Sequence, residues 1–335
     1  GRRVVYLFIA TIDGGTSNTR SYIWKDGQIA GEARVAVGVR NTAIDGNKTR
    51  LLGAVRQTLN EAAHQAGISL ADVSQVLAAG MTSNVGLCEI EHVTAPVTLD
   101  ELAQAMVCQT IEDVCPQAIW FVPGLRNLDP AACTAATIDH MDIMRGEETE
   151  AAGLLAYAAP EGPAVLVLPG SHNKYIMLDG QERLLGCLTT LGGEVLHSLT
   201  YDTILADTLQ RSYAASFDEA AFLRGLADHA QLGLLHGAFM TRILGMFDQG
   251  TTLELQNYLQ GLLLADDLYS LKRSSLFAGL DDAVFVVAGR PVLQAAYACM
   301  FAKQGWRTVL ATAEQQRGLS GYGAIMLAKR RGLIQ

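Results

Sequence analysis

Apolar runs in the first third of the chain predict a group of buried strands. The runs are rich in β-branched and aromatic residues and lie at 4–12, 20–24, 28–35, 73–79 and 118–122. Asp26-Gly27, between the second and third runs, is a strong hairpin signal. Residues 48–66 instead have a helical period, with one apolar stripe formed by Leu51, Leu52, Val55, Leu59, Ala62 and Ala63.

A second group of strands begins near residue 164 and repeats the order of the first. Its strands are expected at 164–168, 174–178 and 181–187, with a small polar turn after the first. Asp26-Gly27-Gln28 and Asp179-Gly180-Gln181 occupy corresponding places and share their letters, which favours an internal duplication.

The remainder of the chain alternates between helical and extended patterns. Helices are expected at 193–209, 217–229, 234–247, 252–271, 291–303 and 317–330, and strands at 283–287 and 306–310. Alternating strand-rich and helix-rich stretches indicate an α/β protein.

Composition limits the kinds of partner. The 335 residues are 50% apolar and 18% charged, which excludes a disordered chain and is enough for two domains. With 25 Lys+Arg against 34 Asp+Glu, the net charge of −9 argues against a nucleic-acid partner. Anionic ligands would therefore need cations placed locally against an unfavourable overall field.

Cysteine usage and hydropathy indicate a reduced, cytoplasmic protein that does not enter the membrane. The six cysteines form no C-x-x-C pair and no cluster with zinc-ligand spacing. No apolar run approaches the ~18 residues that a membrane span requires. The run at 4–10 reads better as a strand than as a signal peptide, because it leads directly into Asp13-Gly14-Gly15.

The first candidate site is the polar turn Asp13-Gly14-Gly15-Thr16-Ser17-Asn18 between two strands. Glycine lets backbone N–H groups approach an oxyanion closely, and the three polar side chains add donors. Asp13 is a candidate Mg²⁺ ligand. The alternative is a tight polar hairpin whose aspartate only closes a turn. P-loop, dinucleotide-binding, zincin and hydrolase motifs are absent from the sequence.

A second turn, Pro169-Gly170-Ser171-His172-Asn173-Lys174, repeats this donor chemistry and adds a cation. Two such hairpins would hold a triphosphate from two sides. An ordinary turn histidine and a solvated Lys174 are the alternative.

The acidic segment Met144-Arg145-Gly146-Glu147-Glu148-Thr149 opens a helix. Acidic residues in a first helical turn are expected from the helix dipole alone, but an arginine there opposes the dipole. A glutamate at this place can take a hydroxyl proton while Arg145 holds an anionic substrate.

Two glycine-containing junctions are the last of the candidate motifs. Gly289-Arg290 lies between a strand and a helix that begins with Pro291, where a base or ribose would fit, although a plain βα connection is equally consistent. Small residues at 318–324 open the last helix and suggest close helix packing at an interdomain hinge.

The order of these motifs resembles the actin/hexokinase/sugar-kinase superfamily and, more narrowly, the 2-dehydro-3-deoxygalactonokinase family over essentially the whole chain. The narrower resemblance is carried by Ala79-Gly80-Met81, Ser83-Asn84-Val85-Gly86, Val122-Pro123-Gly124-Leu125, Met144-Arg145-Gly146-Glu147-Glu148-Thr149 and Pro169-Gly170-Ser171-His172-x-Lys174. The chain departs from the family pattern at Gly14, Ser171 and Asn173, where the family usually carries Trp, Thr and Cys.

The resemblance implies two actin-like (ribonuclease H-like) lobes with duplicated phosphate hairpins and an ATP and substrate cleft between them. We expect lobes at 1–145 and 146–335, with the last helix crossing back. The activity implied is ATP- and Mg²⁺-dependent phosphorylation of 2-dehydro-3-deoxy-D-galactonate, giving the 6-phosphate in galactonate catabolism.

In that scheme each candidate residue has a role. Glu147 is the catalytic base, with Glu148 as the alternative, and Asp13 holds Mg²⁺. ATP phosphates and adenosine are bound by Gly14, Gly15, Thr16, Ser17, Asn18, Gly170, Ser171, His172, Lys174, Gly289 and Arg290. The sugar acid is bound by Arg145, Asn84, Ser83 and Arg20.

Other functions remain open on the sequence. A different sugar or polyol kinase, for example one for 2-dehydro-3-deoxygluconate, would share the ATP half. A non-catalytic ATP-gated binding protein and a phosphohydrolase are further alternatives. The helix-rich stretch 193–271 could carry a homodimer interface.

Overall fold

The computed structural model describes residues 7–279 and 281–335, which divide into two compact units. Unit 1 comprises the described residues up to 159 together with 182–186 and 313–335, and unit 2 comprises 160–181 and 187–312. The division differs from the expected boundary at 145/146, because the helix that starts at Glu147 packs against the last helix of the chain in unit 1. The beginning of the first predicted strand, residues 4–6, lies outside the described residues.

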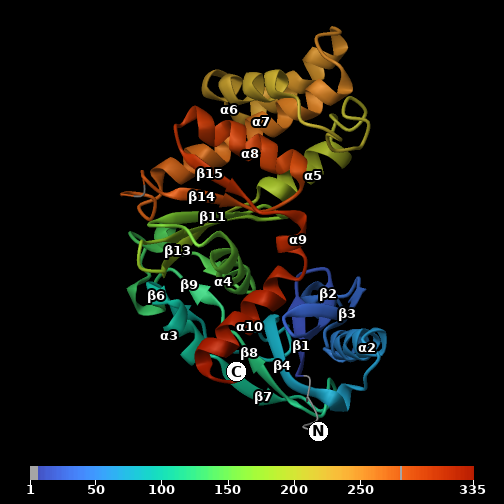
Figure 1. The fold of residues 1–335 in the computed structure, drawn as a ribbon. Helices are drawn as coiled ribbons and strands as arrows, with labels where there is room; N and C mark the ends of the chain where they lie inside the picture. Colours follow the sequence, from blue (N-terminus) through green and yellow to red (C-terminus); the bar gives the residue numbers. More distant parts are fainter. Residues whose placement is uncertain (1–6, 280) are drawn as a thin grey trace. The chain divides into compact units, whose positions relative to one another are not determined.

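Unit 1 is built on a six-stranded sheet of order β3-β2-β1-β4-β8-β7 (Figure 1). Its strands are β1 (Phe8–Gly14), β2 (Thr19–Lys25), β3 (Gln28–Val35), β4 (Val73–Gly80), β7 (Val107–Thr110) and β8 (Ala118–Phe121). The hairpins β1–β2 and β2–β3 are antiparallel, whereas β4 runs parallel to β1 and to β8. A three-stranded sheet joins β10 (Ile143–Met144), β9 (Leu125–Arg126) and β5 (Val93–Thr94).

The helices of unit 1 are α1 (Val39–Asp45), α2 (Thr49–Gln65), α3 (Leu99–Gln104), α4 (Glu147–Ala158), α9 (Ala313–Gln316) and α10 (Leu319–Arg331). The predicted stripe of α2 forms the core, since Leu51, Val55 and Leu59 are fully buried. The helix contacts β2 and β3, as Figure 1 shows. The α2 prediction is therefore confirmed.

Small residues let α10 approach its neighbours without space for a methyl group. A Cβ at Gly323 would overlap the carbonyl oxygen of Thr149 in α4, and one at Gly321 would overlap the Thr11 hydroxyl in β1. The close helix packing predicted from residues 318–324 is confirmed, and both partners lie in unit 1.

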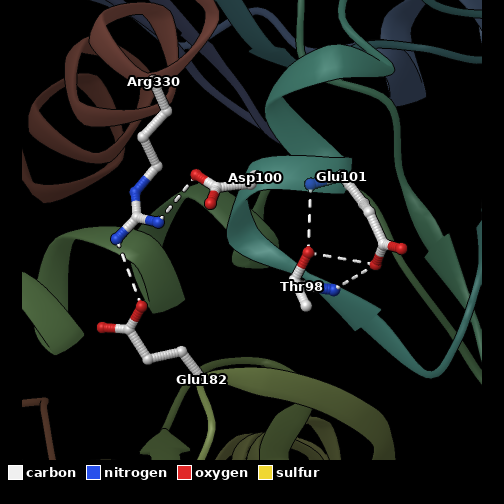
Figure 2. A network of polar contacts seen from close by, with 5 residues as sticks. All are labelled: Thr98, Asp100, Glu101, Glu182 and Arg330. Atoms are coloured by element: carbon white, nitrogen blue, oxygen red, sulfur yellow. Dashed lines mark hydrogen bonds and ion pairs between the residues drawn. The ribbon is translucent and has the colours of Figure 1, made fainter.

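The far end of α10 is tied by ion pairs (Figure 2). The guanidinium of Arg330 lies 2.9 Å from Asp100 Oδ1 and 3.3 Å from Glu182 Oε2. Asp100 stands in the first turn of α3, whose start is closed by a capping box between Thr98 and Glu101. Exposed pairs of this kind contribute about 0–1 kcal/mol each, so packing holds α10 more than charge does.

Unit 2 repeats the strand arrangement of unit 1. Its strands are β11 (Ala164–Leu168), β12 (Asn173–Leu178), β13 (Arg183–Thr190, whose first residues belong to unit 1), β14 (Val284–Val287) and β15 (Arg307–Leu310). Their order β15-β14-β11-β12-β13 is the order of β8-β4-β1-β2-β3. The parallel and antiparallel pairings correspond as well, which supports the predicted duplication.

The helices of unit 2 are α5 (Gly192–Tyr201), α6 (Glu219–Met246), α7 (Thr252–Arg273) and α8 (Pro291–Lys303). The helix predicted at 193–209 is too long, because the Thr203 hydroxyl accepts the N–H of Leu205 at 3.1 Å and a turn replaces the helix. The helices predicted at 217–229 and 234–247 are confirmed as the two helical segments of α6, which are separated by a kink at Gly233, where the backbone is non-helical (φ 69°, ψ 174°).

Candidate active site

Three glycines bring together the ends of β1 and β4 and the start of α4. Gly14 and Gly80 are partners in the parallel β1–β4 register. A Cβ at Gly80 would overlap the Gly14 carbonyl oxygen and lie 3.5 Å from that of Arg145. A Cβ at Gly146 would lie 3.6 Å from the Cα of Gly80. Because glycine has no side chain, the two strand ends and the start of α4 approach closely at this junction. Asp13, the residue before Gly14, therefore lies beside the first turn of α4.

Carboxylates converge at this junction. The pKa of Asp13 is raised chiefly by burial and further by Glu147, while Arg20, its partner across the β1–β2 hairpin, opposes the rise. Burial, together with the charges of Asp13 and Glu147, raises the pKa of Glu150 to about 8. Asp13, Glu147 and Glu150 thus act on one another electrostatically, with Arg20 as the cation among them.

Glu147 and Glu148 have different environments although they are neighbours. Glu147 is half-buried, and its Oε2 accepts the backbone N–H of Arg145 at 2.9 Å. Glu148 is fully buried, and both of its carboxylate oxygens accept the N–H of Gly146, at 2.9 and 2.8 Å. Burial raises the pKa of Glu148 well above its ordinary value, with the charge of Glu147 adding to the effect.

Ser320 connects this junction to α10. Its hydroxyl lies 2.8 Å from the Thr149 hydroxyl and is also hydrogen bonded to the Asp13 carboxylate. Thr149 Oγ1 donates in turn to the carbonyl oxygen of Gly146 at 2.6 Å. The position of Asp13 relative to α4 is therefore fixed by side chains as well as by glycine contacts.

The excess of carboxylates suits a hydrated divalent cation. Among the described residues, no group of three or more His, Cys, Asp and Glu side chains is arranged to hold a metal ion by itself. Mg²⁺ rarely needs three protein ligands, because it usually binds one or two carboxylates and completes its coordination shell with water and substrate phosphates. Asp13, with Glu147 and Glu150 in its field, fits that mode.

In the first phosphate-type hairpin, backbone carbonyl oxygens accept hydrogen bonds, and one backbone donor is used within the turn, since the Gly15 N–H donates to the Asn18 carbonyl at 2.9 Å. The oxygens of Gly15 and Thr16 accept the N–H groups of Val39 and Arg40 at the start of α1, at 3.2 and 3.0 Å. Asn18 Oδ1 accepts two hydrogen bonds from Arg34, at 3.2 and 3.0 Å, which leaves its amide N–H₂ as a donor.

The predicted substrate residues are not all gathered together. Arg145 is exposed and its Nε donates to His92 Nε2 at 3.0 Å. Ser83 and Asn84 form a turn in the loop after β4, closed by the Gly86 N–H on the Ser83 carbonyl at 2.9 Å. Within the described residues their side chains make no hydrogen bond. Arg20 lies with the carboxylates rather than with Arg145.

The second hairpin, in unit 2, is closely packed on α5. A Cβ at Gly193 would overlap the carbonyl oxygen of Gly170, and the Glu194 N–H donates to the Ser171 carbonyl at 2.9 Å. His172 Nε2 lies 2.9 Å from Glu194 Oε1. Lys174 is not solvated but buried, and its Nζ donates to Thr189 Oγ1 at 2.7 Å.

A buried carboxylate on α7 holds this hairpin from behind. Asp267 Oδ2 accepts the Asn173 amide at 2.9 Å and the Tyr175 hydroxyl at 2.7 Å. Asn173 Oδ1 faces the Gly170 N–H at 3.3 Å. The pKa of Asp267 is raised, because the effect of burial exceeds the opposing effect of these hydrogen bonds. Sequence reasoning missed Asp267, because nothing near it in the chain marks it as a partner of the hairpin.

A pocket in unit 2 lies beside the Gly289-Arg290 turn. It is lined mainly by residues of α5, α7 and α8 and of the segment 209–214, among them Arg290, Tyr213 and Asn257. The Arg290 guanidinium lies 5.5 Å from the centre of the Tyr213 ring. Gly289 has a φ of 103° and packs on Pro169, next to the second hairpin. The structure therefore brings the predicted Gly289-Arg290 turn beside Pro169 and the predicted hairpin.

Glu150 and His92 are further residues that the sequence analysis missed. Glu150 stands three residues after Glu147 and so shares its face of α4, a signal that helical spacing provides. His92 had no such signal.

Comparison with known proteins identifies the class of fold first. The chain superposes on a crystal structure from Sinorhizobium meliloti, provisionally assigned as a 2-dehydro-3-deoxygalactonokinase, with a TM-score of 0.72 and 24% identity, covering 96% of this chain and 98% of that one. A provisionally assigned N-acetylglucosamine kinase from Porphyromonas gingivalis gives a TM-score of 0.51 at 15% identity, covering 95% and 99%. The fold is that of the actin/hexokinase-like sugar kinases, as the resemblance predicted.

Sequence comparison is more specific. The family model for 2-keto-3-deoxy-galactonokinase matches residues 13–321, so the chain belongs to that family. It is 26% identical over 282 residues to the 2-dehydro-3-deoxygalactonokinase of Escherichia coli (strain K12), covering 83% of this chain and 84% of that protein. A Rhizobium meliloti (strain 1021) protein provisionally named as the same enzyme is 30% identical over 217 residues. The match covers 64% of this chain and 63% of that relative, so it spans a little under two thirds of the relative's length.

Proposed function

We propose that this protein transfers the γ-phosphate of ATP to the terminal hydroxyl of 2-dehydro-3-deoxy-D-galactonate, giving the 6-phosphate. The observation that carries the proposal is the meeting of Asp13 and Glu147 beside the Gly14–Gly80–Gly146 junction, in a chain of the 2-keto-3-deoxy-galactonokinase family. A kinase needs a metal-binding carboxylate and a base close to one another, and Asp13 and Glu147 would take these two roles.

Glu147 is the base in this proposal. Its half-buried carboxylate takes the proton of the C6 hydroxyl as that oxygen attacks the γ-phosphorus and ADP leaves. The hydrogen bond from the Arg145 N–H orients the carboxylate. Glu148 is less suited, because it is fully buried and both its oxygens already bind the N–H of Gly146. Its part is to hold the start of α4.

Asp13 would hold Mg²⁺ directly or through water. When bound, the ion neutralises charge on the β- and γ-phosphate oxygens. Gly14, Gly15, Thr16, Ser17 and Asn18 would bind phosphate oxygens in unit 1, as would Gly170, Ser171, His172 and Lys174 in unit 2. Fixed donors of this kind need no reorganisation during the reaction, which is the main source of rate in phosphoryl transfer.

The pocket beside Gly289 and Arg290 is the proposed adenosine site. It lies in the same unit as the second hairpin, to which Pro169 connects it. Tyr213 offers an aromatic face and Arg290 a planar cation, both suited to stacking on a flat base.

The substrate carboxylate is assigned to Arg145, with Asn84 and Ser83 as partners for hydroxyl groups. Arg20, which lies among the carboxylates, would instead balance their charge. Preference for the galactonate over the gluconate configuration is part of the proposal and rests on the family alone.

The proposal is tested by coupled ADP release over a panel of 2-oxo-3-deoxy acids, aldoses, glycerol and water. Turnover with the galactonate-type acid supports it. Turnover only with an aldose or glycerol would indicate another sugar or polyol kinase, and release of phosphate with water alone would indicate a phosphohydrolase. Nucleotide binding without any turnover would indicate a binding protein.

Two further parts of the proposal concern the state of the protein. No helix of the described residues is long and apolar enough to cross a membrane. A cytoplasmic location is proposed from membership of a family of metabolic kinases. A homodimer remains a prediction that light scattering would test.

A further inference from the structure

We propose that His92 is a positioning residue that fixes the Arg145 guanidinium for end-on binding of the substrate carboxylate. The inference rests on the proposed function, since it concerns how the sugar acid is recognised. It starts from one contact, the hydrogen bond from Arg145 Nε to His92 Nε2 at 3.0 Å.

The direction of that hydrogen bond defines the state of the histidine. Arginine has only donors, so Nε2 of His92 must accept, and the ring is neutral with its proton on Nδ1. Burial lowers the pKa of His92, and the neighbouring Arg145 and Arg126 lower it further, against a weaker opposing effect of Glu91. Burial and the two arginines outweigh Glu91, so the neutral ring is favoured at physiological pH.

Use of Nε leaves one mode of carboxylate binding to Arg145. A guanidinium binds a carboxylate either through Nε and one Nη or through both Nη groups. With Nε occupied by His92, the two Nη groups form the remaining fork. Within the described residues neither Nη is hydrogen bonded, and Arg145 is exposed.

The histidine itself is held in place by close packing. A Cβ at Gly124, just before β9, would lie 2.7 Å from His92 Cδ2 and 2.9 Å from Nε2, so only glycine leaves space for the ring. The guanidinium of Arg126 is engaged by other partners, since its Nε donates to Thr94 Oγ1 at 2.8 Å and its Nη2 pairs with Glu91 at 3.3 Å. Arg145 is therefore the available cation of the group.

The arrangement couples recognition to catalysis. The backbone N–H of Arg145 binds Glu147, the proposed base, while its side chain is fixed by His92. A histidine that only stabilised the fold would affect all substrates equally. A histidine that orients Arg145 should matter only for a substrate that carries the carboxylate.

The test compares His92→Ala and His92→Gln with the wild-type enzyme, using the sugar acid and its uncharged C1 carboxamide. His92→Ala should raise KM for the acid about tenfold or more, the scale of a hydrogen bond to a charged group. Values of kcat, KM for ATP and KM for the carboxamide should stay near those of the wild type. His92→Gln, which keeps an acceptor, should restore most of the loss.

A pH series adds a second readout. Protonation of His92 removes the acceptor, so KM of the wild type for the acid should rise as the pH falls through the lowered pKa of His92, and the rise should be weaker in His92→Gln. An unchanged KM in His92→Ala, or equal losses for acid and carboxamide, would overturn the inference. Absence of turnover by the wild type with any 2-oxo-3-deoxy acid would overturn the proposed function itself.

Discussion

The backbone N–H of Arg145 donates a hydrogen bond to Glu147 Oε2 at 2.9 Å, across the glycine that opens α4. This contact makes the arginine proposed to bind the substrate and the glutamate proposed as the base parts of one turn. Gly146 can form that turn because its φ is 111°, a conformation that side chains disfavour. The neighbouring carboxylate of Glu148 is used differently, since it closes the same turn from the buried side.

Substitution Glu147→Gln should remove the base while keeping the shape of the side chain. We expect kcat to fall by ~10²-fold or more, the scale of a lost general base, with ATP binding unchanged. Steady-state kinetics and nucleotide titration measure the two quantities. Glu148→Gln is the matched control and should retain turnover within a few-fold of the wild type. The reverse result would move the role to Glu148.

Glu148 should also affect how stability depends on pH. Its folded-state pKa is raised above the ordinary value of 4.5, chiefly by burial. Above pH 4.5 the native state therefore holds a proton that the unfolded state has lost, and the free energy of unfolding falls as the pH rises. Urea unfolding at several pH values should show a weaker fall in Glu148→Gln than in the wild type. Parallel curves would contradict this.

The buried carboxylate of Asp267 should control the second hairpin. Asp267→Ala would remove the acceptor of the Asn173 amide and of the Tyr175 hydroxyl and leave two buried donors unpaired, which should cost about 1–3 kcal/mol of stability and raise KM for ATP. Urea unfolding and kinetics measure both. Asp266→Ala, next to it but paired with His229 nearer the surface, is the control and should have little effect. If both variants behave alike, Asp267 has no special role.

Loss of the Arg290 side chain should weaken nucleotide binding alone. We expect Arg290→Ala to raise KM for ATP and to leave KM for the sugar acid unchanged, because the guanidinium lines the unit 2 pocket. Arg273→Ala removes a cation that stacks on Tyr269 outside that pocket and is the matched control. Equal effects of the two substitutions on ATP would argue against an adenosine site there.

Packing of α10 on α4 should leave no space for one methyl group. Gly323→Ala would force the Cβ into the Thr149 carbonyl oxygen, and such overpacking typically costs about 1–3 kcal/mol. Gly53→Ala, in the interior of α2 with open space around it, should instead stabilise the protein by about 0.5–1 kcal/mol. Urea unfolding of both variants measures these opposite signs.

Local signals account for the parts of the fold that were predicted. Asp26-Gly27 and Asp179-Gly180 mark turns by their own chemistry, so β2, β3, β12 and β13 were predictable to within a few residues. The end of α5 was not, because the hydroxyl of Thr203 decides it through a bond that helical periodicity does not register. Gly233 kinks α6, and the segments on both sides of it pack on α7, at Gly225 against Tyr258 and at Gly237 against Leu262.

The candidate site likewise contains residues that the sequence could predict and residues that it could not. Asp13, Glu147 and the two hairpins belong to short motifs and could be named from the sequence. His92 and Asp267 meet their partners across 53 and 94 residues, so only the fold brings them together. Lys174 was expected at a strand end near phosphate, and its burial beside Thr189 depends on the β12–β13 sheet face rather than on any local signal.

The most direct test of the central claim is the nature of the product. Wild-type protein, ATP, Mg²⁺ and 2-dehydro-3-deoxy-D-galactonate are incubated together, and ³¹P and ¹³C NMR determine which atom carries the phosphate. The account predicts a phosphate coupled to C6, with the yield of product lost in Glu147→Gln. Phosphate on another carbon, or only inorganic phosphate, would contradict it.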